Sequence, residues 1–230
     1  MDRRTLKVHV FTCLGMEDVQ AMEEALCLLP GRRAIGPLMG AFCHGEEGVR
    51  WHAIRGLGAV CQQLYEKDPE GVRWVMRRLI WMLNDESGGI GWGCGEAMGE
   101  IMARIPPMAH EYHRILSSYL DPEGNYLENP LLQRGVLWGL ARLGQASPVF
   151  VRDMRPLLCH YLQKNEPEIL VPALFLAGFL GNGAYSGEIL SHVNDTRQLS
   201  FYWDGRFMPL EIGRLAAGVL ESGGNGVGSG

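Results

Sequence analysis

The sequence has no long hydrophobic run and no excess of positive charge. Its most apolar stretch, residues 169–180, is 12 residues long, whereas a helix that spans a membrane needs about 20. We therefore expect a buried helix there and no membrane partner. The net charge of −5 opposes a protein that must neutralise many phosphates, so nucleic acid is disfavoured as a partner.

Closely spaced cysteines and an N-terminal leader are also missing. The cysteines form no CxxC pair, so we expect most of them to be small core residues rather than disulfide partners, with Cys94 singled out because it lies inside a glycine-rich segment. They are Cys13, Cys27, Cys43, Cys61, Cys94 and Cys159. No apolar segment with a small-residue cleavage site follows Met1, and this favours a cytoplasmic protein.

Catalytic motifs are absent as well. No Gly-x-Ser-x-Gly elbow is present, and the glycines at 88, 89 and 91 are not followed by Lys-Ser or Lys-Thr. His110-Glu111 is the one His-Glu step in the chain, so there is no set of paired His-Glu ligands for a two-metal centre. We therefore expect no catalytic residue, no cofactor and no metal.

Glycine is abundant within one segment that otherwise has a helical apolar pattern, residues 86–104. Gly91, Gly95 and Gly99 are spaced by four residues, and Gly88 falls on the same helical face. Three interior glycines cost about 3 kcal/mol relative to alanine. This predicts a close approach of another helix or of a ligand, with Ser87 as the N-cap.

Small residues recur along the chain with a period of about 40. Gly58, Gly99, Ala141, Gly178 and Gly218 are separated by 41, 42, 37 and 40 residues. Such a period with helical patterns in each half is typical of a two-helix solenoid. We predict about five hairpins beginning near Met16, whose second helices cover residues 32–43, 70–83, 107–120, 148–162 and 186–193.

One stretch near the C-terminus departs from this pattern. Asp204-Gly205 separates two aromatic segments, residues 199–203 and 206–208, and predicts a type I′ β-hairpin. We expect it to cap the terminal repeat before a last helix at 209–221, with a binding element as the alternative. The chain then forms a single domain over 1–222 and a flexible glycine-rich tail over 223–230.

The segments at 49–60 and 132–143 resemble HEAT repeats of the phycobilisome-lyase-like class. Residues 77–93, 96–101 and 202–206 are similar to a group of bacterial HEAT-like proteins of unknown role, associated with sulfate-reducing bacteria. The likeness covers most of residues 17–220. It implies an all-α, right-handed solenoid, and it leaves scaffold, lyase-like and enzymatic roles open.

Two alternatives to a non-catalytic protein-binding scaffold follow from this fold. One is a lyase-like or chaperone-like handler of a cofactor or chromophore. The other is a nucleic-acid-binding protein or DNA glycosylase, since such enzymes include HEAT-like solenoids and Arg73, Trp74, Arg77, Arg78 and Trp81 form a basic aromatic helix. The acidic net charge argues against the second.

We expect the second helices to line a concave surface that binds a protein or an acidic peptide. Arginine side chains of these helices can pair with carboxylates of the partner. In the first half of the glycine segment, the glycines leave backbone uncovered beside the Trp92 ring, which suits a partner helix or a flat ligand. The predicted partner-binding residues are Arg73, Arg77, Asp85, Glu86, Gly91, Trp92, Gly95, Tyr112, His113, Arg152 and Arg155.

Overall fold

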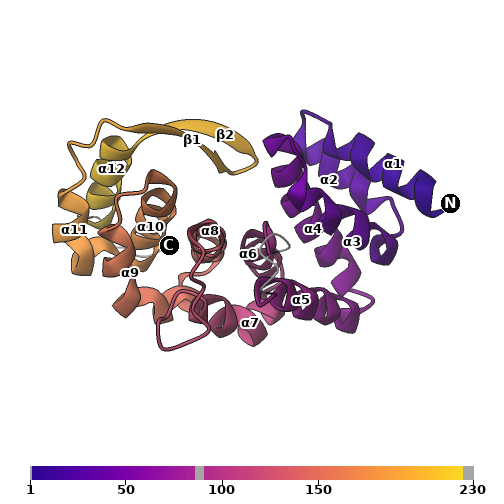
Figure 1. Ribbon diagram of the computed structural model, residues 1–230, viewed down its shortest axis with the longest axis horizontal. Helices are drawn as coiled ribbons and strands as arrows, with labels where there is room; N and C mark the ends of the chain where they lie inside the picture. The colour runs from indigo at the N-terminus through magenta and orange to yellow at the C-terminus, as the bar shows by residue number, and fades with distance from the viewer. Residues whose placement is uncertain (1, 86–90, 225–230) are drawn as a thin grey trace. The chain divides into compact units, whose positions relative to one another are not determined.

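The computed structural model describes residues 2–85 and 91–224. Those residues form twelve α-helices, three short 3₁₀ helices and one two-stranded sheet (Figure 1). The expected all-α solenoid with a small β-hairpin is confirmed. The chain divides into two compact units, Met1–Tyr112 and His113–Gly230. A single domain over 1–222 stays a prediction.

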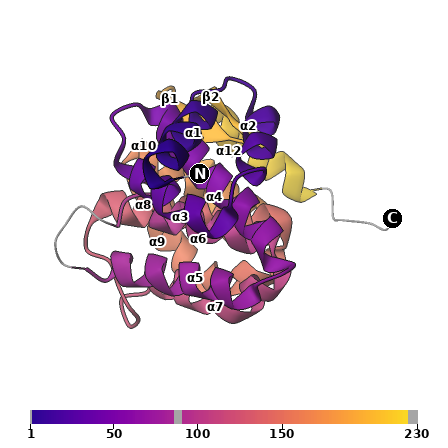
Figure 2. The ribbon, with the colours of Figure 1, turned by 90° about the vertical axis from the view of Figure 1, so that its right-hand side faces the viewer.

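The N-terminal unit consists of consecutive helices joined by short turns. In both Figure 1 and Figure 2, α3 lies between α1 and α5. The elements are α1 (Arg3–Leu14), α2 (Val19–Cys27), α3 (Gly31–Gly40) with the 3₁₀ turn η1 (Ala41–Cys43), α4 (Glu47–Tyr65), α5 (Pro69–Leu83), α6 (Cys94–Arg104) and the start of α7 (Pro106–Ser118).

Aspartate side chains fix where three of these helices begin. The Asp2 carboxylate accepts the backbone N–H of Thr5 at 2.9 Å, and Asp18 accepts that of Ala21 at 3.0 Å. Asp68 likewise caps α5, which carries Pro69 in its first turn. Each cap satisfies backbone donors that have no partner inside the helix. Helix α1 was not among the predicted hairpins, although Asp2 and the apolar spacing of Leu6, Val10 and Leu14 are its sequence signal.

A buried ion network joins α2, α4 and α6. Glu23 accepts hydrogen bonds from Arg55 at 2.9 Å and from Arg104 at 2.6 Å. Arg104 also donates to Glu100 at 2.6 Å, and the Glu100 side chain is fully buried. Burial alone would lower the pKa of Arg104, but Glu100 and Glu23 outweigh it and raise that pKa. Two carboxylates and two guanidinium groups therefore neutralise one another inside the unit.

The recurring small residues mark contacts between successive repeats. A Cβ at Gly58 of α4 would lie 2.6 Å from Glu100 of α6, so a larger residue would displace the ion network. In the C-terminal unit, Gly178 of α10 faces Val219 of α12 at 3.7 Å. Gly218, on the last helix, has nothing within 4 Å. A small residue is thus required at Gly58, whereas the distance at Gly178 is an ordinary van der Waals contact that a Cβ would allow.

The glycine segment begins its helix later than the sequence pattern predicted. Helix α6 begins at Cys94, and Gly91 and Trp92 lie in the preceding turn. Gly93 has φ 74°, and a Cβ there would lie 2.8 Å from the Phe42 ring. The left-handed conformation of Gly93 interrupts the predicted helix. The prediction that Gly91 lies on the same helical face as Gly95 and Gly99 is therefore wrong. Only Gly95 and Gly99 are helical. Gly93, not Ser87, is the N-cap of α6, and residues 86–90 lie outside the described residues.

The C-terminal unit continues the repeat pattern. Its second-helix positions match the predicted residues 148–162 and 186–193 to within a few residues. The elements are α8 (Pro130–Ala146), η2 (Pro148–Met154), α9 (Arg155–Leu162), α10 (Pro167–Leu180), η3 (Asn182–Tyr185), α11 (Ser186–Leu190), β1 (Gln198–Trp203), β2 (Arg206–Glu211) and α12 (Ile212–Gly224).

The β-hairpin is confirmed, and β1 pairs antiparallel with β2. Asp204 at φ 48° and Gly205 at φ 83° form the expected turn. Trp203 packs 4.6 Å from the Phe175 ring of α10 and 5.7 Å from the Trp138 ring of α8. The hairpin therefore covers α8 and α10 (Figure 1), and strand β2 continues to Glu211, so the last helix begins later than predicted, at Ile212.

Candidate functional site: a basic groove in the N-terminal unit

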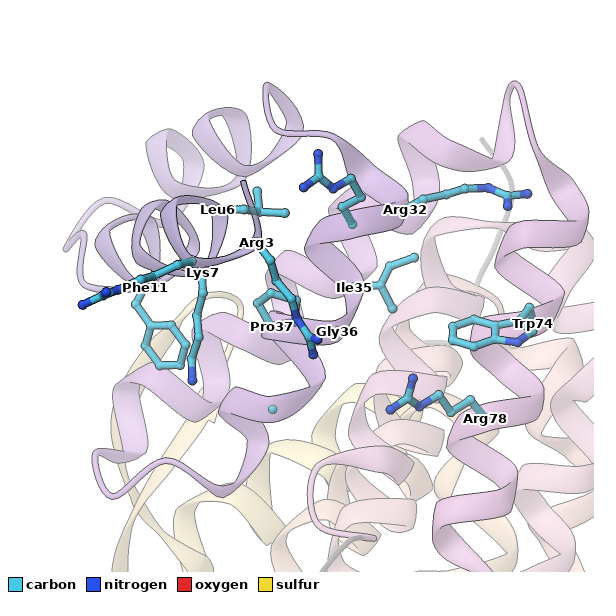
Figure 3. A pocket seen from close by; sticks show the side chains of 13 residues that line it. Arg3, Leu6, Lys7, Phe11, Arg32, Ile35, Gly36, Pro37, Trp74 and Arg78 are labelled. Carbon is cyan, nitrogen blue, oxygen red and sulfur yellow. The ribbon is translucent and has the colours of Figure 1, made fainter. Parts of the chain in front are cut away.

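A cavity of about 890 Å³ lies between α1, α3 and α5 (Figure 3). This is within the range of roughly 300 to 1,000 Å³ that is typical of ligand sites. We call it the basic groove. Its lining residues are Arg3, Arg4, Leu6, Lys7, Phe11, Arg32, Arg33, Ile35, Gly36, Pro37, Gly40, Trp74 and Arg78.

The basic groove concentrates positive charge on an otherwise acidic unit. Six of its lining residues are cationic and none is acidic. The whole unit has only twelve Lys and Arg residues against fifteen Asp and Glu residues. Arg32 forms an ion pair with Asp68 and turns away from the centre of the groove (Figure 3). Among the described residues, no carboxylate forms an ion pair with Arg3, Lys7 or Arg78.

Two opposite walls of the groove each combine an aromatic ring with a cation. On α1, the Lys7 ammonium lies 5.7 Å from the centre of the Phe11 ring. On α5, the Arg78 guanidinium lies 5.4 Å from the centre of the Trp74 ring. Both pairs are spaced by four residues, which places them on one helical face. Trp74 nevertheless keeps 49% of its surface exposed, so it is available to a ligand.

The floor between these walls carries two glycines of α3, Gly36 and Gly40. A Cβ at either position would meet nothing within 4 Å. Gly36 precedes Pro37, whose ring disfavours a helical residue with a side chain before it, so the fold itself explains Gly36. Gly40 has ordinary helical angles, φ −64° and ψ −22°, and no such constraint. Packing therefore does not account for glycine at position 40.

The predicted residues Arg73 and Arg77 lie on α5, beside the groove. The Arg73 guanidinium pairs with Glu111 at 2.7 Å and with Glu70 at 3.2 Å, and this pairing lowers the pKa of Glu111. Arg77 pairs with Glu70 at 3.3 Å and borders a hollow of about 410 Å³ that shares Arg32 and Trp74 with the groove. These two cations are thus partly neutralised by carboxylates of their own unit.

The predicted residues around the glycine segment have different surroundings. Asp85 follows the end of α5, and Glu86 lies outside the described residues. Gly91 is buried in the turn before α6, beside Trp92, which keeps 44% of its surface exposed. Gly95 is buried inside α6. Of this set, Trp92 is the side chain that presents a large apolar surface to solvent.

The remaining predicted residues divide between the two units. Tyr112 is 8% exposed in the N-terminal unit, and burial together with Glu111 raises its pKa. In the C-terminal unit, the His113 ring lies 5.4 Å from that of Phe150, and Arg152 is exposed on η2. Arg155 donates to the backbone carbonyl of Leu180 at 3.0 Å and so caps the end of α10. Arg155 therefore has a structural role in its unit.

Neither a cluster of metal ligands nor a membrane-spanning helix occurs among the described residues. No group of three or more His, Cys, Asp or Glu side chains in residues 2–85 and 91–224 is placed to hold a metal ion. No helix in that part of the chain is long and apolar enough to cross a membrane.

We predict an order of thiol reactivity from these surroundings. Cys43 is exposed, whereas burial raises the pKa of Cys61 to about 12 and also raises that of Cys94. Because the thiolate is the reactive form, Cys43 should react first with Ellman's reagent near neutral pH. Cys61 and Cys94 should react only when the protein unfolds. Mass spectrometry of peptides labelled at short times checks this order, and early labelling of Cys94 would contradict it.

The basic groove itself was not predicted. The sequence indicates that Trp74 and Arg78 belong to a basic aromatic helix. It did not lead to a predicted helix for α1, which contributes Arg3, Lys7 and Phe11. Their spacing by four residues is the signal that the sequence offered.

Comparisons with known proteins bear on the fold. No family model matches the chain, and no curated protein matches it. A designed armadillo repeat protein in complex with the peptide (KR)4 is 14% identical, covers 95% of this chain and 99% of its own, and has a TM-score of 0.54. An engineered protein from the Northeast Structural Genomics Consortium is 12% identical over 96% of both chains, with a TM-score of 0.52.

A third solved structure, the archaeal HEAT-like repeats protein from Thermococcus onnurineus NA1, is 14% identical over 97% of this chain and 80% of its own, with a TM-score of 0.44. The two structures with TM-scores of 0.52 and 0.54, at 12% and 14% identity, show the fold alone. The resemblance to the lyase-like class and to the group from sulfate reducers stays a prediction. The chain has the fold of a helical repeat solenoid.

Proposed function

We propose that this chain is a non-catalytic scaffold whose basic groove binds an acidic segment of a partner protein. The observation that supports the proposal is the lining of the groove, which has six cations and no acidic residue although the net charge of the unit is negative. Arginine guanidinium groups bind carboxylates through two parallel hydrogen bonds, and complementary charge also speeds association. Helical repeats suit this role because they present rigid, extended binding surfaces.

A protein segment fits the charge distribution better than nucleic acid does. Nucleic acid carries regularly spaced phosphates along its whole length, so its affinity depends on cations along an extended path. Here the cations are confined to the groove, and acidic residues such as Asp68 and Glu70 lie next to it. A short acidic segment would place its charges in the groove without meeting these carboxylates.

Charge reversal at Lys7 tests the proposal. Fluorescence anisotropy would measure the affinity for a labelled peptide of alternating Glu and Ser. Lys7→Glu should weaken binding at least about tenfold, because like charges would then face one another. Added salt should weaken binding to the wild type. Lys67→Glu is the matched control, since Lys67 is an exposed lysine of the same unit outside the groove. Equal losses in the two variants would refute the groove as the binding site.

The other predicted partner-binding residues remain part of the proposal, each within its own unit. They are Arg73, Arg77 and Tyr112 in the N-terminal unit, and His113, Arg152 and Arg155 in the C-terminal unit. In the N-terminal unit, Asp85, Glu86, Gly91, Trp92 and Gly95 form a second proposed group. The cytoplasmic location and bacterial origin implied by the sequence also stay expectations.

A handler of a cofactor or chromophore is the second candidate function. The groove volume of about 890 Å³ and its two aromatic walls support it, because cofactor sites are typically concave and lined by apolar side chains. Titration with a tetrapyrrole, followed by absorbance, tests this candidate. A spectral shift that disappears in Trp74→Ala would support it, and no shift would rule it out.

A further inference from the structure

We infer that the acidic segment inserts a bulky apolar side chain into the basic groove, above Gly40 and between Phe11 and Trp74. This inference rests on the proposed function and names the partner more closely. The ligand is a peptide in which one large apolar residue is flanked by carboxylates.

The two walls of the groove have the same arrangement of side chains. Each wall places an aromatic ring beside a cation, Phe11 with Lys7 on α1 and Trp74 with Arg78 on α5. Lys7 and Arg78 both extend into the groove from opposite sides, and so does Arg3 (Figure 3). The cations therefore do not converge on one point, as a single phosphate would require. They suit several negative charges that are separated by an apolar body.

The floor of the groove has no side chain at Gly40, the last residue of α3. A Cβ at this position would contact nothing within 4 Å. A side chain there would occupy the groove rather than the protein core, since Gly40 is exposed and lines the groove. Glycine at position 40 thus keeps open the space that an inserted side chain would fill.

The groove also exposes apolar surface to solvent. Trp74 is half exposed, and Pro37 and Phe11 are partly exposed on the other sides of the same cavity. Exposed aromatic surface in a concave site is typical of anchor pockets for one partner residue. A purely ionic ligand would leave this apolar surface in water.

Two labelled peptides test the inference by fluorescence anisotropy. Both alternate Glu and Ser, and the central residue is Phe in one and Ala in the other. The wild type should bind the Phe peptide about 10- to 100-fold more tightly, as expected for burying one large side chain. Gly40→Leu should bring this ratio close to one, because leucine fills the anchor space. Gly48→Leu is the matched control, since Gly48 is a helical glycine of the same unit, also without neighbours at its Cβ, and should keep the ratio.

Each result decides a different claim. A ratio near one in the wild type, with Lys7-dependent binding of both peptides, would overturn the anchor and leave the proposed function standing. An unchanged ratio in Gly40→Leu would also overturn it. Binding of neither peptide would refute the proposed function as well, as would tighter, Lys7-dependent binding of a single-stranded oligonucleotide. If Gly40→Leu does not fold, Trp74→Ala replaces it and should lower the same ratio.

Discussion

Arg104→Ala should lower the free energy of unfolding of the N-terminal unit by about 3 to 5 kcal/mol. The substitution removes the partner that holds Glu100 at 2.6 Å and two of the hydrogen bonds to Glu23. Glu100 is fully buried, so its charge would remain in the interior without its closest cationic partner, while Arg55 stays at 3.9 Å. Urea denaturation followed by circular dichroism measures the loss.

Arg77→Ala is the control for this prediction. It removes an ion pair of the same type in the same unit, but the Arg77 side chain is 55% exposed and Glu70 is 68% exposed. Exposed pairs contribute about 0 to 1 kcal/mol, because water screens the charges. A loss in Arg104→Ala no larger than that in Arg77→Ala would show that the buried network does not stabilise the packing of α2, α4 and α6.

Trp203→Ala should destabilise the C-terminal unit by about 3 to 5 kcal/mol, the usual cost of removing a buried tryptophan. Trp203 is 4% exposed and packs against Phe175, Phe179 and Trp138. Its loss would leave a cavity beneath the hairpin, where the indole of Trp138 also donates to the Tyr202 carbonyl at 2.9 Å. Thermal and urea unfolding would measure the change.

Phe207→Ala on the facing strand provides the comparison. Phe207 is 39% exposed and contacts Tyr202 edge-on at 5.1 Å, so it buries much less surface than Trp203. We expect less than half the loss seen in Trp203→Ala, because the cost follows the apolar area removed from water. Equal losses in the two variants would contradict the role of Trp203 as the main contact between the hairpin and α8 and α10.

The repeat architecture could be predicted because the same packing position recurs in each repeat, so small residues recur in the sequence about every 40 positions. Gly58 and Gly178 lie where a helix of the following repeat approaches, and their spacing reveals the period. The β-hairpin was equally visible, because Asp204-Gly205 supplies the positive φ angles that its turn requires. The close approach of Glu100 at Gly58 and the positive φ angles at Asp204-Gly205 restrict the residue types at these positions, so one sequence is sufficient.

The glycine segment shows where such reasoning fails. Apolar spacing favoured a helix from residue 86, but Gly93 adopts a left-handed conformation against Phe42, a residue distant in sequence. The contact that selects this turn is tertiary and has no local pattern. The buried network is similar, since Glu100 and Arg104 are spaced for a helical ion pair while Glu23 comes from another helix.

The candidate site depended on the same kind of long-range information. Lys7, Gly40 and Trp74 form one groove only because α1, α3 and α5 each contribute to its lining. The sequence identified the basic aromatic character of α5 and the preference for an acidic partner. It did not indicate that α1 supplies the opposite wall, because Arg3 and Lys7 are typical of any solvated helix.

Zero-length cross-linking is the most direct test of the central claim, that an acidic segment binds in the basic groove. The chain has three lysines, Lys7 in the groove and Lys67 and Lys164 outside it. A carbodiimide joins a lysine amine to a carboxylate that it touches, and mass spectrometry identifies the lysine. With the acidic Phe peptide, we predict cross-links mainly at Lys7, abolished by excess unlabelled peptide. Cross-links spread equally over Lys7, Lys67 and Lys164 would contradict the account.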